Sequence, residues 1–505
     1  MNIFSFGLLF NKKQMKQKVS IIGAGFSGLS AAASLAQKGF KVQVFEKHDI
    51  PGGRARKFSE NGFTYDMGPS WYWMPDVFDN FFKQFGYKTS DFYQLERLDP
   101  AYRIYYGQND FIDVPSGRQN VIDLFESIEK GSGAKLDKYL KQAEYKYDAG
   151  INDLVNKPAL SFLEFVKLKY LKEVFRLDLF KSMHKYVLQN FKDPRLYTLL
   201  QFPVIFLGAT PKRTPALYSL MNYSDIELGT WYPTGGMYEV IKSMHKVAEN
   251  LGVEFIFNSE VNEFHFNDNK INELVVNGKS IDTDIVVASA DYNYVEQKLL
   301  PAKFRRYTEK YWDKREMSPS SIIFYLGINK KLSGFLHHTL FFHEEFEPHA
   351  NDIFENPCWP DKPLLYTSAT SQTDKTVAPE GMENLMVLIP VASGLEDNDA
   401  VRDKYYKLII DKLESLTGQK IEEHIVYKRV YAHNDFSNDY HAYKGNAYGL
   451  GNTLLQTAFL KPKITSKKLD NLFYTGQLTT PGPGVPPTII SGQVVGNYIA
   501  KKFSR

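Results

Sequence analysis

Cysteine, long apolar runs and net charge are all scarce in this sequence of 505 residues. Cys358 is the single cysteine, which excludes intramolecular disulfides, CxxC redox pairs and cysteine-rich metal sites. No run approaches the roughly 20 apolar residues that a membrane-spanning helix needs. The formal net charge of +3 is too small to indicate a nucleic acid partner. We therefore expect a globular, intracellular protein that does not bind nucleic acid.

Motifs for metal or nucleophile chemistry are missing as well. The segment HEEFEPH, residues 343–349, is not an HExxH motif, and its proline is expected to interrupt the helix that such a zinc site needs. His337 and His338 are adjacent, and neighbours in sequence do not usually bind one metal. No GxSxG elbow or Walker loop is present. The sequence thus predicts no metal site, and it leaves the catalytic residues unknown.

The first residues, MNIFSFGLLFNKKQMKQKVS, have an apolar stretch before the lysines rather than after them. A signal peptide has the reverse order and a small-residue cleavage site, so we reject that interpretation. Two interpretations remain. Translation starts at Met15, directly before a strand, or the apolar residues 4–10 form an interfacial anchor. We favour the start at Met15.

A glycine-rich fingerprint follows in residues 18–47, KVSIIGAGFSGLSAAASLAQKGFKVQVFEK. It reads as an apolar strand, the pattern Gly23-x-Gly25-x-x-Gly28, an alanine-rich helix and a second strand that ends at Glu46. Gly23 allows a tight turn, Gly25 lets the backbone approach a pyrophosphate, and Gly28 lets the helix pack closely on the strand. Glu46 lies where an acid accepts from a ribose 2′-OH, which argues against NADP. The unit predicts a dinucleotide site with phosphates at the helix N-terminus.

A second motif separates FAD from NAD. Gly52, Gly53 and Arg54 follow the acidic strand, and the segment DMGPS, residues 66–70, comes after them. This order resembles the FAD-containing amine oxidase and carotenoid desaturase superfamily. The resemblance implies that Gly53 and Arg54 contact the cofactor, with Arg54 near its phosphates or flavin. It implies the same for Gly68, Pro69 and Ser70. The simpler alternative for Arg54 is a surface arginine that caps a turn.

Three further stretches resemble the phytoene desaturase family. These are a YPxGGM element followed by a helix and strands in residues 229–264, a strand leading to an Ala-Asp turn in 281–301, and the segment 216–229. In such flavoproteins the backbone at the position of Val261 commonly meets the adenine. An ordinary strand valine is an equally good interpretation. The resemblance covers residues 18–503.

The C-terminal stretch GQLTTPGPGVPPTIISG, residues 476–492, also resembles this family and implies that Gly476, Gly484, Val485 and Pro486 contact the flavin end of FAD. Many flavoproteins have Gly-Asp where this chain has Gly476 and Gln477, so a direct contact of Gln477 is in doubt. The prolines are expected just before or within the first turn of a final helix, where missing N–H groups cost nothing. That helix N-terminus would stabilise a reduced, anionic flavin.

The fold class predicted from these segments is α/β. Residues 17–85, 230–300 and 465–505 form a discontinuous Rossmann-type FAD-binding domain, and residues 86–150 and 301–464 form an α+β substrate-binding domain. Residues 151–229 are expected to be a helical region for membrane association or substrate access. The stretch 157–192 has eight basic residues against three acidic ones, which suits an interfacial surface, although a buried helix pair with a charged edge explains it equally well. Residues 202–207, FPVIFL, either line an apolar access route or join the core.

The predicted function is FAD-dependent desaturation of a linear carotene, most simply phytoene to lycopene or an intermediate. Flavin accepts the hydrogen because no side chain removes it readily from a hydrocarbon. Alternatives are another carotenoid substrate such as a later carotene or a C30 diapophytoene, a saturase, an amine oxidase, or a non-catalytic prenyl-lipid escort protein of the same fold. The expected partners are a long apolar polyene, a membrane surface and an electron acceptor, oxygen or quinone. The expected location is cytoplasmic and peripheral to the membrane. The oligomeric state is left open.

Overall fold

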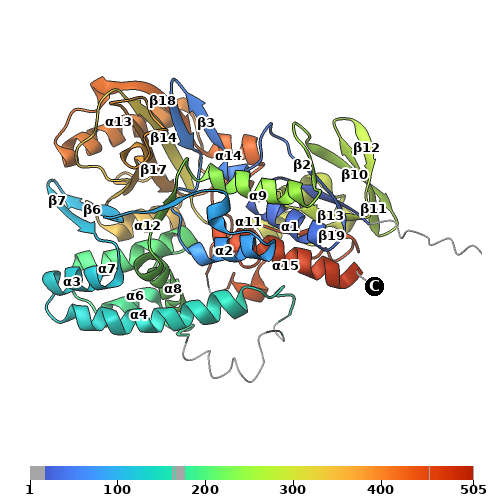
Figure 1. Cartoon of the computed structure of the whole chain (residues 1–505), viewed down its shortest axis with the longest axis horizontal. Helices are drawn as coiled ribbons and strands as arrows, with labels where there is room; N and C mark the ends of the chain where they lie inside the picture. The colour runs from blue at the N-terminus through green and yellow to red at the C-terminus, as the bar shows by residue number, and fades with distance from the viewer. Residues whose placement is uncertain (1–16, 162–163, 165–176, 454, 504–505) are drawn as a thin grey trace, which may run out of the picture.

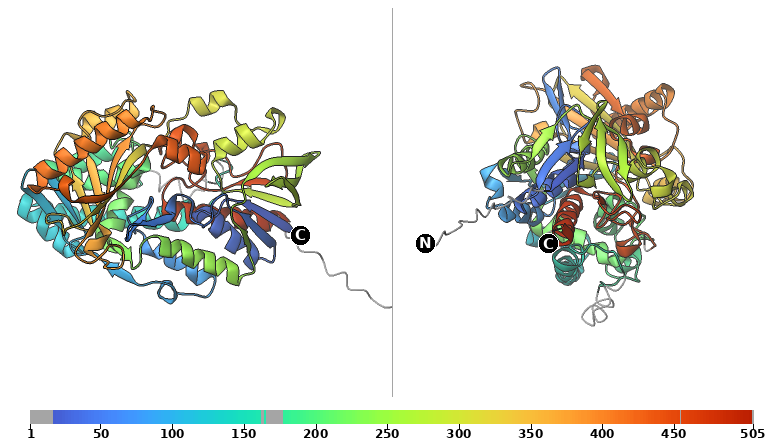
Figure 2. Two further views of the ribbon diagram at one scale, coloured as in Figure 1. Left: turned by 90° about the horizontal axis from the view of Figure 1, so that it is seen from above. Right: turned by 90° about the vertical axis from the view of Figure 1, so that its right-hand side faces the viewer.

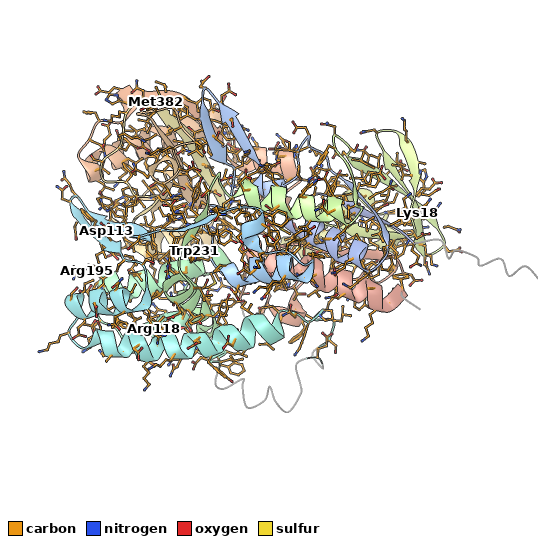
Figure 3. The ribbon with its side chains drawn as sticks, in the orientation of Figure 1. Lys18, Asp113, Arg118, Arg195, Trp231 and Met382 are labelled. Atoms are coloured by element: carbon orange, nitrogen blue, oxygen red, sulfur yellow. The ribbon has the colours of Figure 1, made fainter. Side chains whose placement is uncertain are left out.

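The computed structural model describes residues 17–161, 164, 177–453 and 455–503. The molecule is elongated, with a five-stranded sheet toward one end and a seven-stranded sheet toward the other (Figure 1). Lys18, at the start of the first strand, and Asp113, in a strand of the larger sheet, lie far apart along this axis (Figure 3). The interpretations placed on residues 1–16, and on Lys167, Lys169, Lys172 and Arg176, fall outside the described residues.

The five-stranded sheet is parallel and gathers strands from distant parts of the chain. Its order is β19 (Leu472–Tyr474), β13 (Ile285–Ala288), β1 (Lys18–Ile22), β2 (Lys41–Phe45) and β9 (Glu254–Ile256). Both faces of a parallel sheet are covered, which explains the apolar runs VSII and IVVA. The fingerprint strand β1 is the central one, with β2 and β13 on either side.

Helices cover one face of this sheet and a small antiparallel sheet covers the other. The helices are α1 (Phe26–Gln37), α9 (Tyr238–Asn250) and α15 (Val485–Phe503). In Figure 2 the C-terminal helix α15 lies beside the N-terminal segments. The opposite face packs against β10 (Val261–Asn267), β11 (Lys270–Val276) and β12 (Lys279–Asp282).

The seven-stranded sheet is mixed and borders the middle of the molecule. Its order is β18 (Ile425–Tyr431), β14 (Ser320–Ile328), β17 (Glu383–Val391), β16 (Leu365–Ser368), β15 (His338–Phe341), β6 (Tyr102–Gly107) and β7 (Asp110–Val114). One face packs on α13 (Asp399–Thr417), which begins where the Asn398 side chain accepts from the Val401 N–H and ends at Gly418, in the left-handed region. The other face carries Ile323 and Leu388 toward the centre.

Further helices lie along the lower side of Figure 1. They are α3 (Arg118–Ile128), α4 (Ser132–Ala149), α6 (Met183–Leu188), α7 (Pro194–Gln201) and α8 (Leu220–Tyr223). Residues 202–207 form a short 3₁₀ helix in which Phe202 is buried. Among the described residues, no helix combines the length and the apolar character needed to cross a bilayer.

Shorter elements connect these parts. They are the hairpin β3 (Lys57–Glu60) and β4 (Phe63–Asp66), the pair β5 (Leu95–Arg97) and β8 (Trp231–Pro233), and the helices α2 (Pro75–Gln84), α10 (Tyr292–Tyr294), α11 (Glu309–Asp313), α12 (Phe346–Phe354) and α14 (His433–Tyr440). The predicted α/β fold, with a Rossmann-type sheet built from discontinuous segments, is confirmed. The domain boundaries proposed from sequence stay a prediction.

Candidate functional site

A cavity opens at the carboxyl ends of the parallel strands. Gly23 follows β1, Glu46 follows β2, Ser289 follows β13 and Thr475 follows β19, and all four line this cavity. The carboxyl edge is where open α/β sheets bind their ligands. The cavity extends to Ile323 and Leu388, on the inner face of the seven-stranded sheet.

The structure brings nearly all of the predicted cofactor-binding residues to this one cavity. Those that line it are Gly23, Gly25, Glu46, Gly53, Arg54, Gly68, Pro69, Ser70, Val261, Gly476, Gly484, Val485 and Pro486. Gly28 does not line it. A Cβ on Gly28 would lie 2.0 Å from the carbonyl oxygen of Gly23, so this glycine permits the close approach of α1 to the strand end.

Gly25 and Glu46 shape the end of the cavity beside α1. A Cβ on Gly25 would meet no atom within 4 Å, so it would project into the open space of the cavity beside the start of α1. The buried Glu46 carboxylate accepts from the N–H groups of Ala24 at 2.7 Å and His48 at 3.0 Å. Each carboxylate oxygen keeps capacity for a further hydrogen bond, as a ribose hydroxyl would require.

Arg54 presents a partly buried cation to the cavity. Its Nε has no hydrogen-bond partner among the described atoms, and its guanidinium lies 5.1 Å from the ring centre of Tyr440. Burial lowers the pKa of Arg54, and the charge of Asp291 opposes that shift. Asp291 also lines the cavity, and burial raises its pKa. An arginine with a free buried donor is suited to an anionic or polar ligand such as a diphosphate.

Asp66 joins two of the motifs noted in the sequence. Its carboxylate accepts from the N–H of Met237 at 2.7 Å and of Tyr238 at 3.0 Å, at the start of α9. This contact holds the DMGPS segment against the GGM element. A Cβ on Gly68 would lie 2.5 Å from the carbonyl oxygen of Arg54, so glycine also lets this segment pass the Gly-Gly-Arg turn. Burial raises the pKa of Asp66 to about 6, and the two N–H groups oppose the shift.

The C-terminal loop also borders the cavity. Gly484 has a φ of +109°, in the region that favours glycine, and α15 begins at the next residue. Pro486 and Pro487 therefore occupy its first turn, as the sequence predicted. Gln477 also lines the cavity, and its amide donates to Asn446 Oδ1 at 3.2 Å.

Aromatic side chains and a short polar chain form the wall toward the larger sheet. The rings of Trp71 and His338 stack at 4.0 Å between centres. The Tyr366 hydroxyl donates to Ser70 Oγ at 2.7 Å and lies 2.8 Å from His338 Nδ1. Burial and the neighbouring His337 hold the pKa of His338 well below its ordinary value, so this imidazole is neutral. The wall is therefore uncharged, and Ser70 and Trp71 are fixed against it.

The residues present fit FAD. The glycine cradle at Gly25 has the space that a phosphate backbone contact needs, and Arg54 supplies a buried donor without a partner. Two helix starts border the cavity, that of α1 and, after a glycine-rich loop, that of α15. These features match a long ligand with an anionic middle.

The histidine segment needs a correction. Pro348 does not interrupt the helix: α12 runs from Phe346 to Phe354 with Pro348 in its first turn, where proline is tolerated. His349 lies in this helix and His343 precedes it. Within the described ranges, no group of three or more His, Cys, Asp or Glu side chains is placed to hold a metal.

Several residues of the site were not predicted. Asp291 follows β13 at the carboxyl edge, and that position in the Ala-Asp turn was the signal for it. Tyr440 in α14 and the pair His338 and Tyr366 had no local signal, because their role depends on which strands become neighbours.

Comparison with known proteins agrees with the geometry. Residues 26–497 match the family described as flavin containing amine oxidoreductase. A carotenoid 3,4-desaturase from Haloarcula japonica is 39% identical over 94% of this chain and 97% of its own length. A zeta-carotene-forming phytoene desaturase from Myxococcus xanthus is 30% identical over 95% of this chain and 93% of its own length.

A solved structure supports the fold. An oxidoreductase from Methanosarcina mazei superposes with a TM-score of 0.62 at 15% identity, over 95% of this chain and all of that one. The matches confirm the predictions of FAD as cofactor and of an oxidoreductase that acts on CH–CH bonds. The chain belongs to the flavin-containing amine oxidoreductases and, within them, to the FAD-dependent carotenoid desaturases.

Proposed function

We propose that this enzyme desaturates phytoene, a linear C40 hydrocarbon, to lycopene or to a partly desaturated intermediate. The observation that carries the proposal is the cavity itself. Its cofactor end is polar and fits FAD, whereas its wall toward the larger sheet is formed by Trp71, Trp73, Ile323 and Leu388. A hydrocarbon needs this kind of surface because it has no group that a polar site could bind.

The residues of the protein bind and orient the cofactor. We assign cradling of the diphosphate to Gly23, Gly25 and the start of α1, and hydrogen bonding of the ribose to Glu46. Arg54 supplies a positive charge near the phosphates or the flavin. Bound FAD supplies the oxidant that accepts hydrogen from the substrate. At the flavin end, the start of α15 contributes its partial positive charge, and Gly484 permits the backbone to come close.

The aromatic wall excludes water and aligns the polyene. Trp71 is held by its stack on His338, and the Trp73 indole N–H donates to Thr230 Oγ1 at 2.8 Å. Both rings therefore keep fixed orientations at the cavity surface. An extended substrate that lies along fixed rings presents successive carbons in one geometry, which is what repeated desaturation requires.

Expression in cells that accumulate phytoene tests the proposal. Pigment chromatography is expected to show loss of phytoene and formation of coloured products. Unchanged phytoene in the presence of folded, flavin-loaded enzyme would contradict it. The matched negative control is the same strain with the Gly25→Arg variant, which fills the cradle.

A second candidate is desaturation of the 3,4 bond of a carotenoid that already has a conjugated chain. It is favoured by the relative from Haloarcula japonica, whose identity of 39% exceeds the 30% of the phytoene desaturase. The two functions differ in their substrates. Cells that accumulate lycopene instead of phytoene would then yield a product with a longer conjugated system, visible as a red-shifted absorption spectrum.

We also propose that the enzyme works at a membrane surface, where its substrate and a quinone or oxygen as electron acceptor are available. Phe180 and Leu455 are the most exposed large apolar side chains of the described residues, at 80% and 78%. Lys181 and Lys185 lie near Phe180 in sequence and would face anionic lipid headgroups.

Liposome flotation tests the membrane proposal. The double variant Phe180→Glu and Leu455→Glu is expected to lose binding to anionic vesicles. The control is Val426→Glu in β18, which replaces a half-exposed apolar residue on the seven-stranded sheet. Equal vesicle binding by the double variant and by Val426→Glu would contradict a role of Phe180 and Leu455 in membrane binding.

A further inference from the structure

A second, smaller pocket adjoins the main cavity. It is lined by side chains from α12, β15, β16 and β17, among them Leu340, Ala350, Ile353 and Leu365. The pocket is open to solvent on one side, and about 540 Å³ is the free space in and in front of it together.

The pocket and the cavity share their wall. Tyr366 and Leu388 border both. An aromatic series also leads from one to the other, because the ring of Phe202 lies 6.1 Å from that of Trp71 in the cavity and 6.1 Å from that of Phe342 in the pocket. A hydrocarbon ligand that extends from the cavity past Tyr366 would therefore contact apolar surface along its whole path.

The pocket offers no free polar group to a ligand. Apart from His349 and Tyr366, its lining is hydrocarbon, aromatic or proline. His349 Nε2 donates to the carbonyl of Pro390 at 2.7 Å, and Nδ1 accepts from the N–H of Leu364 at 3.1 Å, so both ring nitrogens are occupied. Burial lowers the pKa of His349 to about 4, which keeps the ring neutral. The Tyr366 hydroxyl is engaged by Ser70 and His338.

We infer that this pocket binds one end of the linear carotenoid, and that it accepts an unsubstituted hydrocarbon end and discriminates against a hydroxylated one. The inference rests on the proposed function. A hydroxyl in this pocket would lose its hydrogen bonds to water and find no partner in exchange. A methyl-branched hydrocarbon end would lose no hydrogen bonds to water and would gain contacts with the lining. The pocket thereby limits how far the carotenoid can slide past the flavin.

The test compares two chain lengths and two end groups with the flavin-loaded enzyme. Ala350→Phe fills the pocket. It is expected to lower kcat/KM for the C40 phytoene at least tenfold relative to the C30 diapophytoene, which needs less room. For the unaltered enzyme, affinity for lycopene, measured from the shift of its absorption on binding, is expected to exceed that for 1-hydroxylycopene at least tenfold.

Ile353→Ala is the second variant and would answer the question if Ala350→Phe fails to fold. It enlarges the pocket and is expected to weaken the discrimination against the hydroxylated end at least threefold. Ile389→Ala is the matched control, because Ile389 is equally buried in β17 but does not line the pocket. It should leave both ratios unchanged.

The outcomes separate the inference from the function beneath it. If the unaltered, flavin-loaded enzyme converts no carotene, the proposed function fails. If it converts phytoene but Ala350→Phe leaves the C40 to C30 ratio within twofold, the inference is overturned. Equal loss with both chain lengths would make the pocket a passage rather than an end site, which also overturns it. Equal affinity for lycopene and its hydroxylated form would contradict the end-group selectivity.

Discussion

The hydroxyl of Ser30 in α1 donates a 2.7 Å hydrogen bond to the carbonyl of Ile489 in α15. The two residues are 459 positions apart in sequence. The carbonyl belongs to the first turns of α15, so the bond fixes the C-terminal helix start directly to the fingerprint helix. Both helix starts that border the cavity are thereby set relative to each other, and a ligand that spans them meets a preformed site.

Two glycine substitutions near this contact should have different consequences. Gly25→Ala is expected to leave the fold intact, because Gly25 has a φ of −75° and an added Cβ meets no atom within 4 Å. FAD affinity should fall at least tenfold, because the methyl group occupies the cradle. In Gly492→Ala the added Cβ would lie 2.4 Å from the carbonyl oxygen of Ser27, so α15 cannot keep its packing on α1.

Thermal unfolding of the flavin-free proteins and titration with FAD distinguish these variants. Gly492→Ala should lower Tm clearly, and Gly25→Ala should not. The exposed Asn497→Ala on α15 serves as the control for the helix. A Gly25→Ala protein that retains FAD as well as the unaltered enzyme would remove this glycine from the cofactor site.

Gly484→Val is expected to abolish activity. A valine at a φ of +109° is strained by about 1–3 kcal/mol, and relief of that strain would move the cavity loop that we propose to contact the flavin. Turnover of the carotenoid and flavin content are the measurements. Gly418→Val, at the end of α13, introduces valine at a φ of +67° away from the cavity and should cost stability but not turnover. Full activity of Gly484→Val would refute the assignment.

Arg54→Met should separate cofactor binding from stability. Methionine keeps much of the side-chain volume and removes the charge and the free Nε donor, so FAD affinity should fall at least tenfold. Arg56→Met is the control, because Arg56 pairs with Asp439 at 2.6 Å and does not line the cavity. Isothermal titration with FAD and thermal unfolding report the two effects. If both variants lose FAD affinity equally, Arg54 has no specific role.

Ionisation of the buried Asp225 is expected to lower the free energy of unfolding as pH rises. Burial raises its pKa from 3.8 to about 7, while hydrogen bonds from Tyr102 and Thr230 oppose the shift. The folded state binds the proton of Asp225 more tightly than the unfolded state does. The stabilisation from this protonation is therefore complete below about pH 4 and is lost as pH rises to about 7. Three pKa units correspond to about 4 kcal/mol.

Urea unfolding at pH 5 and pH 8 measures this effect. Asp225→Asn should reduce the difference in unfolding free energy between the two pH values, because the amide does not ionise. Asp268→Asn, in an exposed turn between β10 and β11, should leave the difference as it is. An unchanged pH dependence in Asp225→Asn would show that another group is responsible.

The glycine fingerprint was readable because its chemistry is local. Gly23, Gly25, Gly28 and Glu46 act within one strand, helix and strand unit, and spacing along the chain fixes their positions. The histidine segment at 343–349 shows the limit of such reasoning. A proline there suggested a broken helix, yet the first turn of α12 tolerates it because that turn does not use the missing N–H.

The sequence by itself determined the central strand, the glycine turn that follows it and the glycine and proline geometry of the C-terminal loop, because these depend on backbone preferences of neighbouring residues. Only the tertiary structure decided that the Arg54 Nε is buried without a partner, that His338 lies against Trp71, and that an apolar pocket adjoins the cavity. These features come from strands and helices that are distant in sequence. Which side chains meet there depends on packing among β14 to β17, α12 and α14, and no local pattern encodes it.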